Sequence, residues 1–143
     1  MSLQWIHESA ARWDAGKQRI VGGAPAGIFE LGGVEVGALV PGDWWRVEDE
    51  AGETIGYGWM DIVGMAGDAE VLLAVDSAHQ GKGAGTFIMD HLEREAADRG
   101  LNYLSNIVRP SHPDKEGITA WLKKRGYVER GDGQLARLVK AKP

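Results

Sequence analysis

Two neighbouring stretches decide the fold of this chain: Val71-Leu72-Leu73-Ala74-Val75, and then Gln80-Gly81-Lys82-Gly83-Ala84-Gly85. Five consecutive apolar residues are typical of a central strand that is covered on both faces. The glycines of the second stretch leave little side-chain bulk, so a ligand can approach the main chain closely. An amphipathic helix follows from about Thr86 to Arg99, because apolar residues recur every four positions at Ala84, Ile88, Leu92 and Ala96. N–H groups at the start of such a helix suit a phosphate or pyrophosphate.

The spacing of the glycines separates three interpretations of this loop. A P-loop needs a Lys directly after its last glycine, but Gly85 is followed at once by Thr86. A dinucleotide-binding fingerprint needs its third glycine one residue later than Gly85, and normally follows the first strand of a domain. A strand-to-helix turn without any ligand is the third interpretation. Glycine spacing alone leaves a ligand-binding role and a purely structural role open.

Upstream of the buried strand, the pattern predicts a hairpin. Trp44 to Glu48 leads through a turn into Thr54 to Val63, which alternates so that Tyr57, Trp59 and Asp61 share one face. Nearer the N-terminus, a short strand Gln4 to His7 precedes Ser9, a good helix N-cap, and a helix to about Val21. Residues 26–42 have no clear pattern, and Ile28 to Leu31 fits either a helical turn or a strand.

Downstream, strand and helix signals alternate to the end of the chain. Tyr103 to Val108 is expected to form a strand, and Ile118 to Arg125 a helix that stops at Gly126. Two short strands, Tyr127 to Val128 and Leu135 to Val139, close the sequence. With no internal repeat or linker, residues 1–143 are expected to form one mixed α/β domain with an antiparallel front half.

Composition narrows the classes of function. The chain has 143 residues, a net charge of −5 and no cysteine. The absence of cysteine removes disulfides, thiolate catalysis and cysteine-ligated metals, and fits a cytoplasmic protein. A nucleic-acid partner usually requires a basic footprint, and a membrane helix requires about 18 apolar residues, so neither partner is expected. We expect no metal site, and the acidic balance slightly favours a cationic small molecule.

The loop and its surroundings resemble one family. Gln80-x-x-Gly83-x-Gly85 matches the (Arg/Gln)-x-x-Gly-x-(Gly/Ala) signature of the GNAT superfamily of N-acetyltransferases, and the segment from about Trp44 to Val128 is similar to that family's core. The resemblance implies an α/β (α+β) fold with a mixed, mostly antiparallel, twisted sheet of six to seven strands and about four flanking helices. It also implies a V-shaped splay between the fourth and fifth strands.

The same resemblance implies acetyl-CoA as co-substrate, without a metal. Main-chain groups of Leu73, Ala74 and Val75 would bind the pantetheine arm, and one N–H would polarise the thioester carbonyl. The pyrophosphate would lie on the loop and the first helical turn, at Gln80, Gly81, Lys82, Gly83, Ala84, Gly85 and Thr86.

Acyl transfer to an amine also needs a group that takes the amine's proton, because an alkyl amine with a pKa of about 10.4 is protonated at pH 7. Glu70, at the start of the central strand, is the first candidate, and a solvated strand-end charge is its alternative. Asp61 is the second, since Tyr57 and Trp59 beside it would suit a cationic amine. Burial of those aromatic rings in the core is the alternative there. His112 is a third candidate base.

Two positions depart from the family pattern. Many members have a Tyr that protonates the departing sulfur where this chain has Leu122, and an Asn that contacts the cofactor where it has Lys115. Tyr127 is expected to pack in the core rather than replace that acid.

The resemblance therefore implies an acetyl-CoA-dependent N-acetyltransferase that acts on a primary amine of a small molecule or protein. A non-catalytic acyl-CoA-binding sensor or interaction module is the alternative, and transfer of a longer acyl chain is a third possibility. The expected partners are acetyl-CoA and the acceptor, in a monomer or homodimer.

Overall fold

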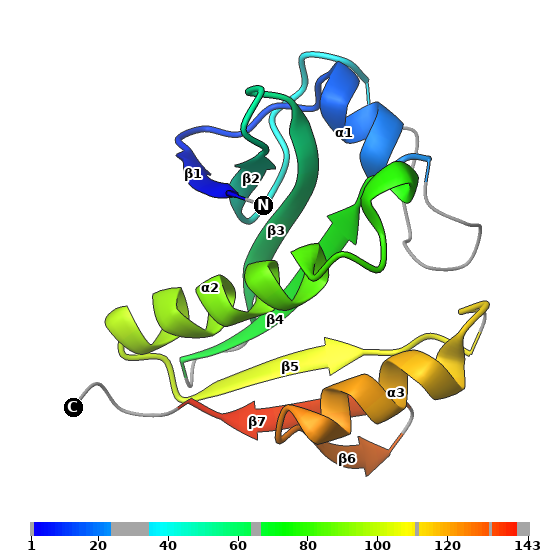
Figure 1. Ribbon diagram of the computed structural model, residues 1–143. Helices are drawn as coiled ribbons and strands as arrows, with labels where there is room; N and C mark the ends of the chain where they lie inside the picture. The colour runs from blue at the N-terminus through cyan, green and yellow to red at the C-terminus, as the bar shows by residue number, and fades with distance from the viewer. Residues whose placement is uncertain (1, 24–34, 64–66, 111, 132, 140–143) are drawn as a thin grey trace.

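A seven-stranded mixed sheet forms the centre of the protein (Figure 1). The structure is a computed structural model and describes residues 2–23, 35–63, 67–110, 112–131 and 133–139. In chain order the strands are β1 (Gln4–Glu8), β2 (Asp43–Glu48), β3 (Thr54–Val63), β4 (Asp68–Val75), β5 (Tyr103–Ile107), β6 (Val128–Gly131) and β7 (Gln134–Leu138). Their spatial order is β1-β2-β3-β4-β5-β7-β6, and only the β4–β5 pair is parallel. The prediction of a mixed, mostly antiparallel sheet is confirmed.

Three α-helices flank this sheet in the described part of the chain: α1 (Ala15–Ile20), α2 (Ala84–Asp98) and α3 (Lys115–Lys124). A short 3-10 helix, η1 (Ser77–His79), leads from β4 towards α2. Buried residues of α2 and α3 belong to one hydrophobic core cluster, whereas Ile20 of α1 belongs to a second cluster. About four helices were expected, and the described residues contain three α-helices. The segment Ile28 to Leu31, expected to be a helical turn or a strand, lies outside the described residues.

The sheet opens between its fourth and fifth strands. β4 pairs with β5 only at Asp68, Ala69 and Glu70, opposite Tyr103, Leu104 and Ser105. Beyond Glu70, β4 follows β3 and rises away from β5 (Figure 1). The predicted V-shaped splay is thus present, and it begins where the apolar run Val71 to Val75 begins.

The two faces of β3 carry opposite kinds of side chain. Gly56 and Gly58 lie under α2, where a Cβ on Gly58 would come within 2.6 Å of Ile88 Cγ2. On the other face, Tyr57 and Trp59 pack with α1 and are 2% and 6% exposed. The lack of side chains at Gly56 and Gly58 therefore lets α2 approach the sheet closely, while Tyr57 and Trp59 fill the space beneath α1.

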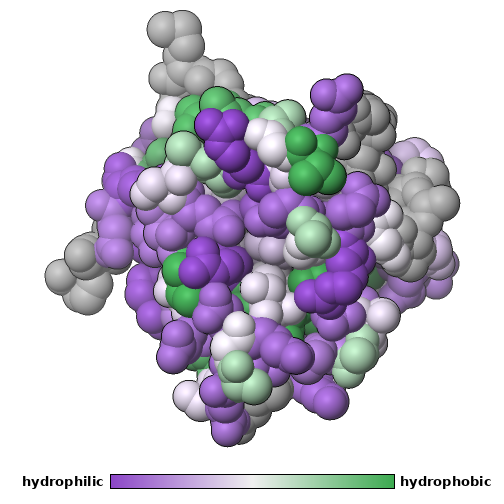
Figure 2. All heavy atoms as spheres, turned by 90° about the horizontal axis from the view of Figure 1, so that it is seen from above, coloured by the Kyte–Doolittle hydropathy of each residue, from purple (hydrophilic) through white to green (hydrophobic). Residues whose placement is uncertain are grey.

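The apolar stripe predicted for α2 is the centre of the larger core cluster. Ala84, Ile88, Leu92 and Ala96 are all buried, each at most 2% exposed. Seen from above, the outer surface is mainly hydrophilic, with hydrophobic residues in small separate areas (Figure 2). In the described ranges, no helix combines the length and apolarity that crossing a bilayer requires.

The first helix is shorter than predicted. It is capped by Asp14, which accepts a hydrogen bond from the Lys17 N–H, and not by Ser9. Residues before it are held in extended pairing instead, because Trp13 N–H donates to Ala38 O at 2.8 Å and Val40 N–H donates to Ala11 O at 3.0 Å. Ala10 has a φ of 53°, which a helix cannot accommodate. The prediction of a helix from Ser9 was wrong for this reason.

Candidate active site

Beyond Glu70, the edge of β4 that faces the splay directs main-chain groups into the opening without pairing to β5. Val71 O accepts a hydrogen bond from Asn106 Nδ2 at 2.7 Å, and Val75 O accepts one from Gln80 Nε2 at 3.2 Å. Both carbonyls therefore point away from β3. Since main-chain direction alternates along a strand, Leu73 points the same way, whereas Ala74 points towards β3. Among the three residues predicted for the pantetheine arm, Leu73 and Val75 direct main-chain groups into the opening.

The glycine loop leads from this edge into α2. Gly81 and Gly83 have φ of 78° and 84°, and a Cβ on either would meet nothing within 4 Å. Gly83 is the N-cap of α2, and no side chain caps the helix there. The start of this 15-residue helix therefore has no side-chain cap at Gly83, and the two glycines leave room for a ligand beside its first N–H groups. This arrangement fits an anionic ligand such as a pyrophosphate.

A cavity of about 450 Å³ adjoins both features. Six of the ten residues predicted to bind the cofactor line it: Leu73, Ala74, Val75, Gln80, Gly81 and Gly85. Lys82, Gly83 and Thr86 lie exposed on the same loop and first turn, and Ala84 is buried in the core. The structure thus brings six of the ten predicted residues to one cavity, and the other four do not line it.

The sequence did not predict two further side chains of this cavity, the cationic Arg19 and the titratable His79. Arg19 of α1 donates to Asp76 Oδ2 and to Thr54 O, each at 2.9 Å. His79 of η1 lies with Nδ1 3.4 Å from the same Asp76 oxygen. Both line the cavity. Arg19 reaches it from a separate segment of the chain, so no local pattern could have indicated it.

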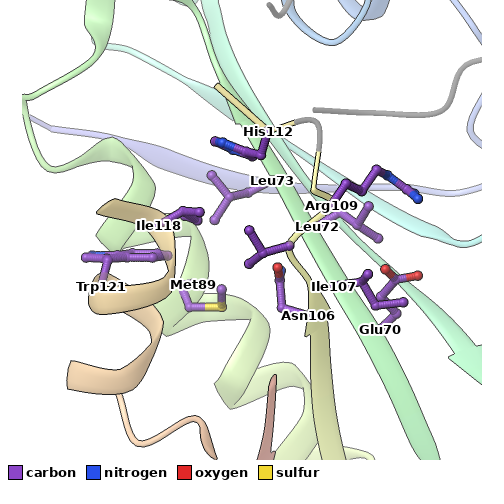
Figure 3. A pocket seen from close by; sticks show the side chains of 11 residues that line it. Glu70, Leu72, Leu73, Met89, Asn106, Ile107, Arg109, His112, Ile118 and Trp121 are labelled. Carbon is purple, nitrogen blue, oxygen red and sulfur yellow. The ribbon is translucent and has the colours of Figure 1, made fainter. Parts of the chain in front are cut away.

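A second, smaller cavity of about 80 Å³ lies deeper in the splay (Figure 3). Met89, Ile118 and Trp121 form its apolar side, on α2 and α3, while Glu70 and Arg109 lie on the opposite side. The cavity therefore has an apolar wall that suits a small acyl group and a charged mouth.

One of the two predicted carboxylates lies at the charged mouth, and the other is its partner on the next strand. Asp61 and Glu70 are directly opposed on β3 and β4, although only Glu70 lines the cavity. Burial raises the pKa of the Glu70 carboxyl, the negative charge of Asp61 raises it further, and Arg109 opposes both effects. Burial also raises the pKa of Asp61. A carboxylate whose pKa is raised towards neutrality is a better proton acceptor than an ordinary surface Glu.

The aromatic residues beside Asp61 do not form an open wall for a cation. Trp59 stacks on Trp44 with ring centroids 4.2 Å apart. Lys17 Nζ lies 5.0 Å from the centroid of the Tyr57 ring and bonds to Glu8 Oε1 at 2.7 Å, and its side chain is fully buried. The chain's own lysine thus already lies over one of the two rings that were expected to face a cationic substrate. The alternative that Tyr57 and Trp59 are core residues is the one observed.

Asn106 was also missed from the sequence. Its amide bonds to Val71 O one residue beyond the last β4–β5 pair, and its side chain lines the smaller cavity. A side-chain amide thus spans the gap where the two main chains have already separated. The only local signal was a polar residue within an otherwise ordinary strand.

His112 lines both cavities, but its hydrogen bonding does not suit a base. The Asp114 N–H donates to His112 Nδ1 at 2.9 Å. Since Nδ1 is already an acceptor, a neutral ring carries its proton on Nε2 and has no nitrogen free to accept another. This geometry argues against the predicted role as proton acceptor.

The positions that depart from the family pattern are placed as follows. Leu122 is fully buried, and Lys115 is exposed at the first turn of α3. Tyr127 is 2% exposed, with its hydroxyl 3.5 Å from Met89 Sδ and 3.4 Å from Glu93 Oε2. Tyr127 is therefore a core residue as predicted, and its burial raises the pKa of the hydroxyl. Within the described residues, no three His, Cys, Asp or Glu side chains gather as a candidate metal site.

A parted pair of central strands beside a glycine loop at a helix N-terminus is the arrangement that the resemblance to the GNAT acyltransferases implies. In agreement, residues 41–129 match the family described as "Acetyltransferase (GNAT) domain". This chain belongs to the GNAT acetyltransferase family, whose members use acetyl-CoA. No curated protein sequence matches it.

Solved structures show the same fold. A proposed acetyltransferase from Acinetobacter baylyi has a TM-score of 0.76 at 8% identity, over 99% of this chain and 95% of that chain. A ribosomal-protein-alanine N-acetyltransferase from Escherichia coli has a TM-score of 0.66 at 15% identity, over 99% and 97%. A phosphinothricin acetyltransferase from Sinorhizobium meliloti, in complex with AcCoA, has a TM-score of 0.60 at 17% identity, over 68% and 61%.

Proposed function

We propose that this protein is an N-acetyltransferase that moves the acetyl group of acetyl-CoA to a primary amine. One observation carries the proposal: β4 parts from β5 after Glu70, and its open edge adjoins the 450 Å³ cavity at the start of α2. A solved structure of the same fold holds AcCoA. The open edge and the glycine loop would bind the pantetheine and pyrophosphate, respectively.

Binding would use main-chain groups more than side chains. Leu73 and Val75 would hydrogen-bond the pantetheine amides, as strands bond in a sheet. The N–H groups from Gly81 to Thr86 would surround the pyrophosphate, and Lys82 and Arg19 would add positive charge nearby. One N–H on the open edge of β4 would stabilise the oxyanion that develops on the thioester carbonyl.

Glu70 would act as the proton acceptor for the incoming amine. The amine nitrogen attacks the thioester carbon, the carbonyl electron pair moves onto oxygen, and the nitrogen's proton goes to Glu70. When the tetrahedral species collapses, the C–S bond breaks and its electron pair leaves on sulfur. Asp61 would assist by keeping the pKa of Glu70 high, and its charge favours a cationic acceptor near the mouth.

A non-catalytic acyl-CoA sensor is the second candidate function. It is favoured by Leu122, which is fully buried and offers no hydroxyl where many relatives have a proton donor. The two candidates differ in turnover and not in cofactor binding.

A thiol-release assay with a panel of primary amines, combined with calorimetry of acetyl-CoA binding, separates them. We expect turnover in the wild type, and a loss of about 100-fold or more in kcat for Glu70→Gln with acetyl-CoA affinity preserved. Glu53→Gln, at the exposed hairpin turn, is the matched control and should behave as wild type. Tight acetyl-CoA binding without turnover on any amine would replace the enzyme proposal with the sensor.

A further inference from the structure

The two cavities of the splay share three lining residues: Leu73, His112 and Ile118. The larger cavity adjoins the loop proposed to hold the pyrophosphate, and the smaller one contains Glu70. A bound thioester would therefore have its sulfur near the junction between them. Of the three shared residues, His112 is the one whose side chain can donate a hydrogen bond. Figure 3 shows its ring above Leu73 and Ile118, at the upper end of the smaller cavity.

The orientation of the His112 ring is fixed by the turn that starts α3. The Asp114 N–H donates to Nδ1 at 2.9 Å, and the His112 N–H donates to Arg109 O at 2.9 Å. Asp114 is itself the N-cap of α3 and accepts from the Gly117 N–H. A main-chain donor at Nδ1 selects the neutral tautomer that carries hydrogen on Nε2. The ring thus presents a donor, in a fixed tautomer, beside the junction.

The departing sulfur needs such a donor. Breaking the C–S bond leaves a full negative charge on sulfur, and a charged acceptor gains more from a hydrogen bond than a neutral one. Leu122 has no polar group, and the Tyr127 hydroxyl is directed to Met89 and Glu93. His79 is held against Asp76 at the loop end of β4, away from the smaller cavity.

We infer that His112 is a catalytic residue whose Nε2–H donates a hydrogen bond to the thiolate sulfur as it leaves. This inference rests on the proposed function. The amine proton goes to Glu70, the C–S electron pair goes to sulfur, and the hydrogen on Nε2 stays on the ring. The thiolate takes its own proton from water after release, so His112 is unchanged by each turnover.

A pair of substitutions separates this role from a structural one. His112→Asn places an amide oxygen near the Nδ1 position, so it can still accept from Asp114 N–H, but it lacks the Nε2 donor. His112→Gln places an amide NH₂ near the Nε2 position and loses the Asp114 bond. Each variant is measured for kcat with the best amine, for acetyl-CoA affinity by calorimetry, and for thermal stability.

We expect His112→Asn to melt near wild type and bind acetyl-CoA normally, with kcat lowered about 10- to 100-fold. His112→Gln should melt lower and yet retain several-fold more turnover than His112→Asn. Wild-type kcat in His112→Asn, or activity that follows melting temperature in both variants, would overturn the inference alone. A wild type without turnover on any amine would instead defeat the proposed function itself.

Discussion

The two edges of β4 are used in opposite ways. Along one edge, eight residue pairs join β4 to β3 from Val63↔Asp68 to Gly56↔Val75. Along the other, three pairs join it to β5, and the remainder faces the cavities. The same apolar run thus builds the sheet with one edge and presents main-chain groups with the other. A residue whose side chain packs in the core can therefore still bind a ligand through its main chain.

The largest expected effect concerns the loop at the end of the open edge. Gly83→Asp adds bulk and negative charge where the pyrophosphate is proposed to lie, and should weaken acetyl-CoA binding by about 100-fold or more. Gly52→Asp is a matched control. Gly83 and Gly52 have φ of 84° and 80°, and a Cβ on either would meet nothing within 4 Å. Both variants carry similar backbone strain. Calorimetry showing equal acetyl-CoA affinity for the two variants would contradict the assignment of the loop.

The closed edge is tested through the glycine that brings α2 close to β3. Gly58→Ala would place a Cβ 2.6 Å from Ile88 Cγ2 and 3.0 Å from the Trp5 ring. Overpacking of this kind costs about 1–3 kcal/mol of the free energy of unfolding. Gly85→Ala is the control, since its Cβ would meet only Leu73 Cδ1 at 3.9 Å and alanine favours a helix. Urea unfolding should show a lower free energy of unfolding for Gly58→Ala and a higher one for Gly85→Ala. A change of the same sign in both variants would contradict the close approach of α2 to Gly58.

The junction between the paired and parted lengths depends on Asn106. Asn106→Ala removes the donor to Val71 O, and should lower the free energy of unfolding by about 1 kcal/mol. Asn106→Asp keeps the shape of the side chain, but an ionised carboxylate cannot donate to Val71 O. At pH 7 this variant should therefore lose more free energy of unfolding than Asn106→Ala, and the loss should shrink in acid, where the carboxyl is protonated. Denaturant titrations at two pH values provide the measurement. No difference between the two variants at pH 7 would count against this hydrogen bond.

The smallest expected effect lies at the paired end, where Glu70 is held. Folding raises the pKa of the Glu70 carboxyl above its ordinary value of 4.5. As the pH rises from below this value, Glu70 therefore ionises more readily in the unfolded chain, and the free energy of unfolding falls. Glu70→Gln should therefore melt slightly higher than wild type at pH 7, and the difference should disappear below about pH 4. A variant that melts lower than wild type at pH 7 would show that Glu70 stabilises the fold instead.

The strand and helix pattern around the site could be read from the sequence because its signals are local. β3 has the bounds predicted from its alternation, and the four-residue apolar repeat gives the buried face of α2. The start of α1 could not be predicted, since Ser9 is a good cap in isolation and only the distant pairing with residues 38–40 prevents a helix there. Turn and capping signals are overridden when a remote segment supplies better main-chain partners.

The candidate site was predictable in part for the same reason. Its loop and open strand are contiguous in sequence, so the motif and the apolar run indicated them together. Arg19, Asn106 and Trp121 reach the cavities from three other elements, and nothing near them in the sequence indicates that they meet. The tautomer of His112 depends on one main-chain hydrogen bond, which no residue pattern encodes.

The buried Lys17 has a chemical consequence for a protein that would hold an activated acyl donor. Thioesters slowly modify lysine amines that water can reach, and Arg19 and Ile20 of the same short helix line the larger cavity. Lys17 is sealed between Glu8 and Asp14 with no exposed surface. The helix that lines the larger cavity therefore keeps its amine out of reach, and this part of the cavity wall would be protected from self-acylation.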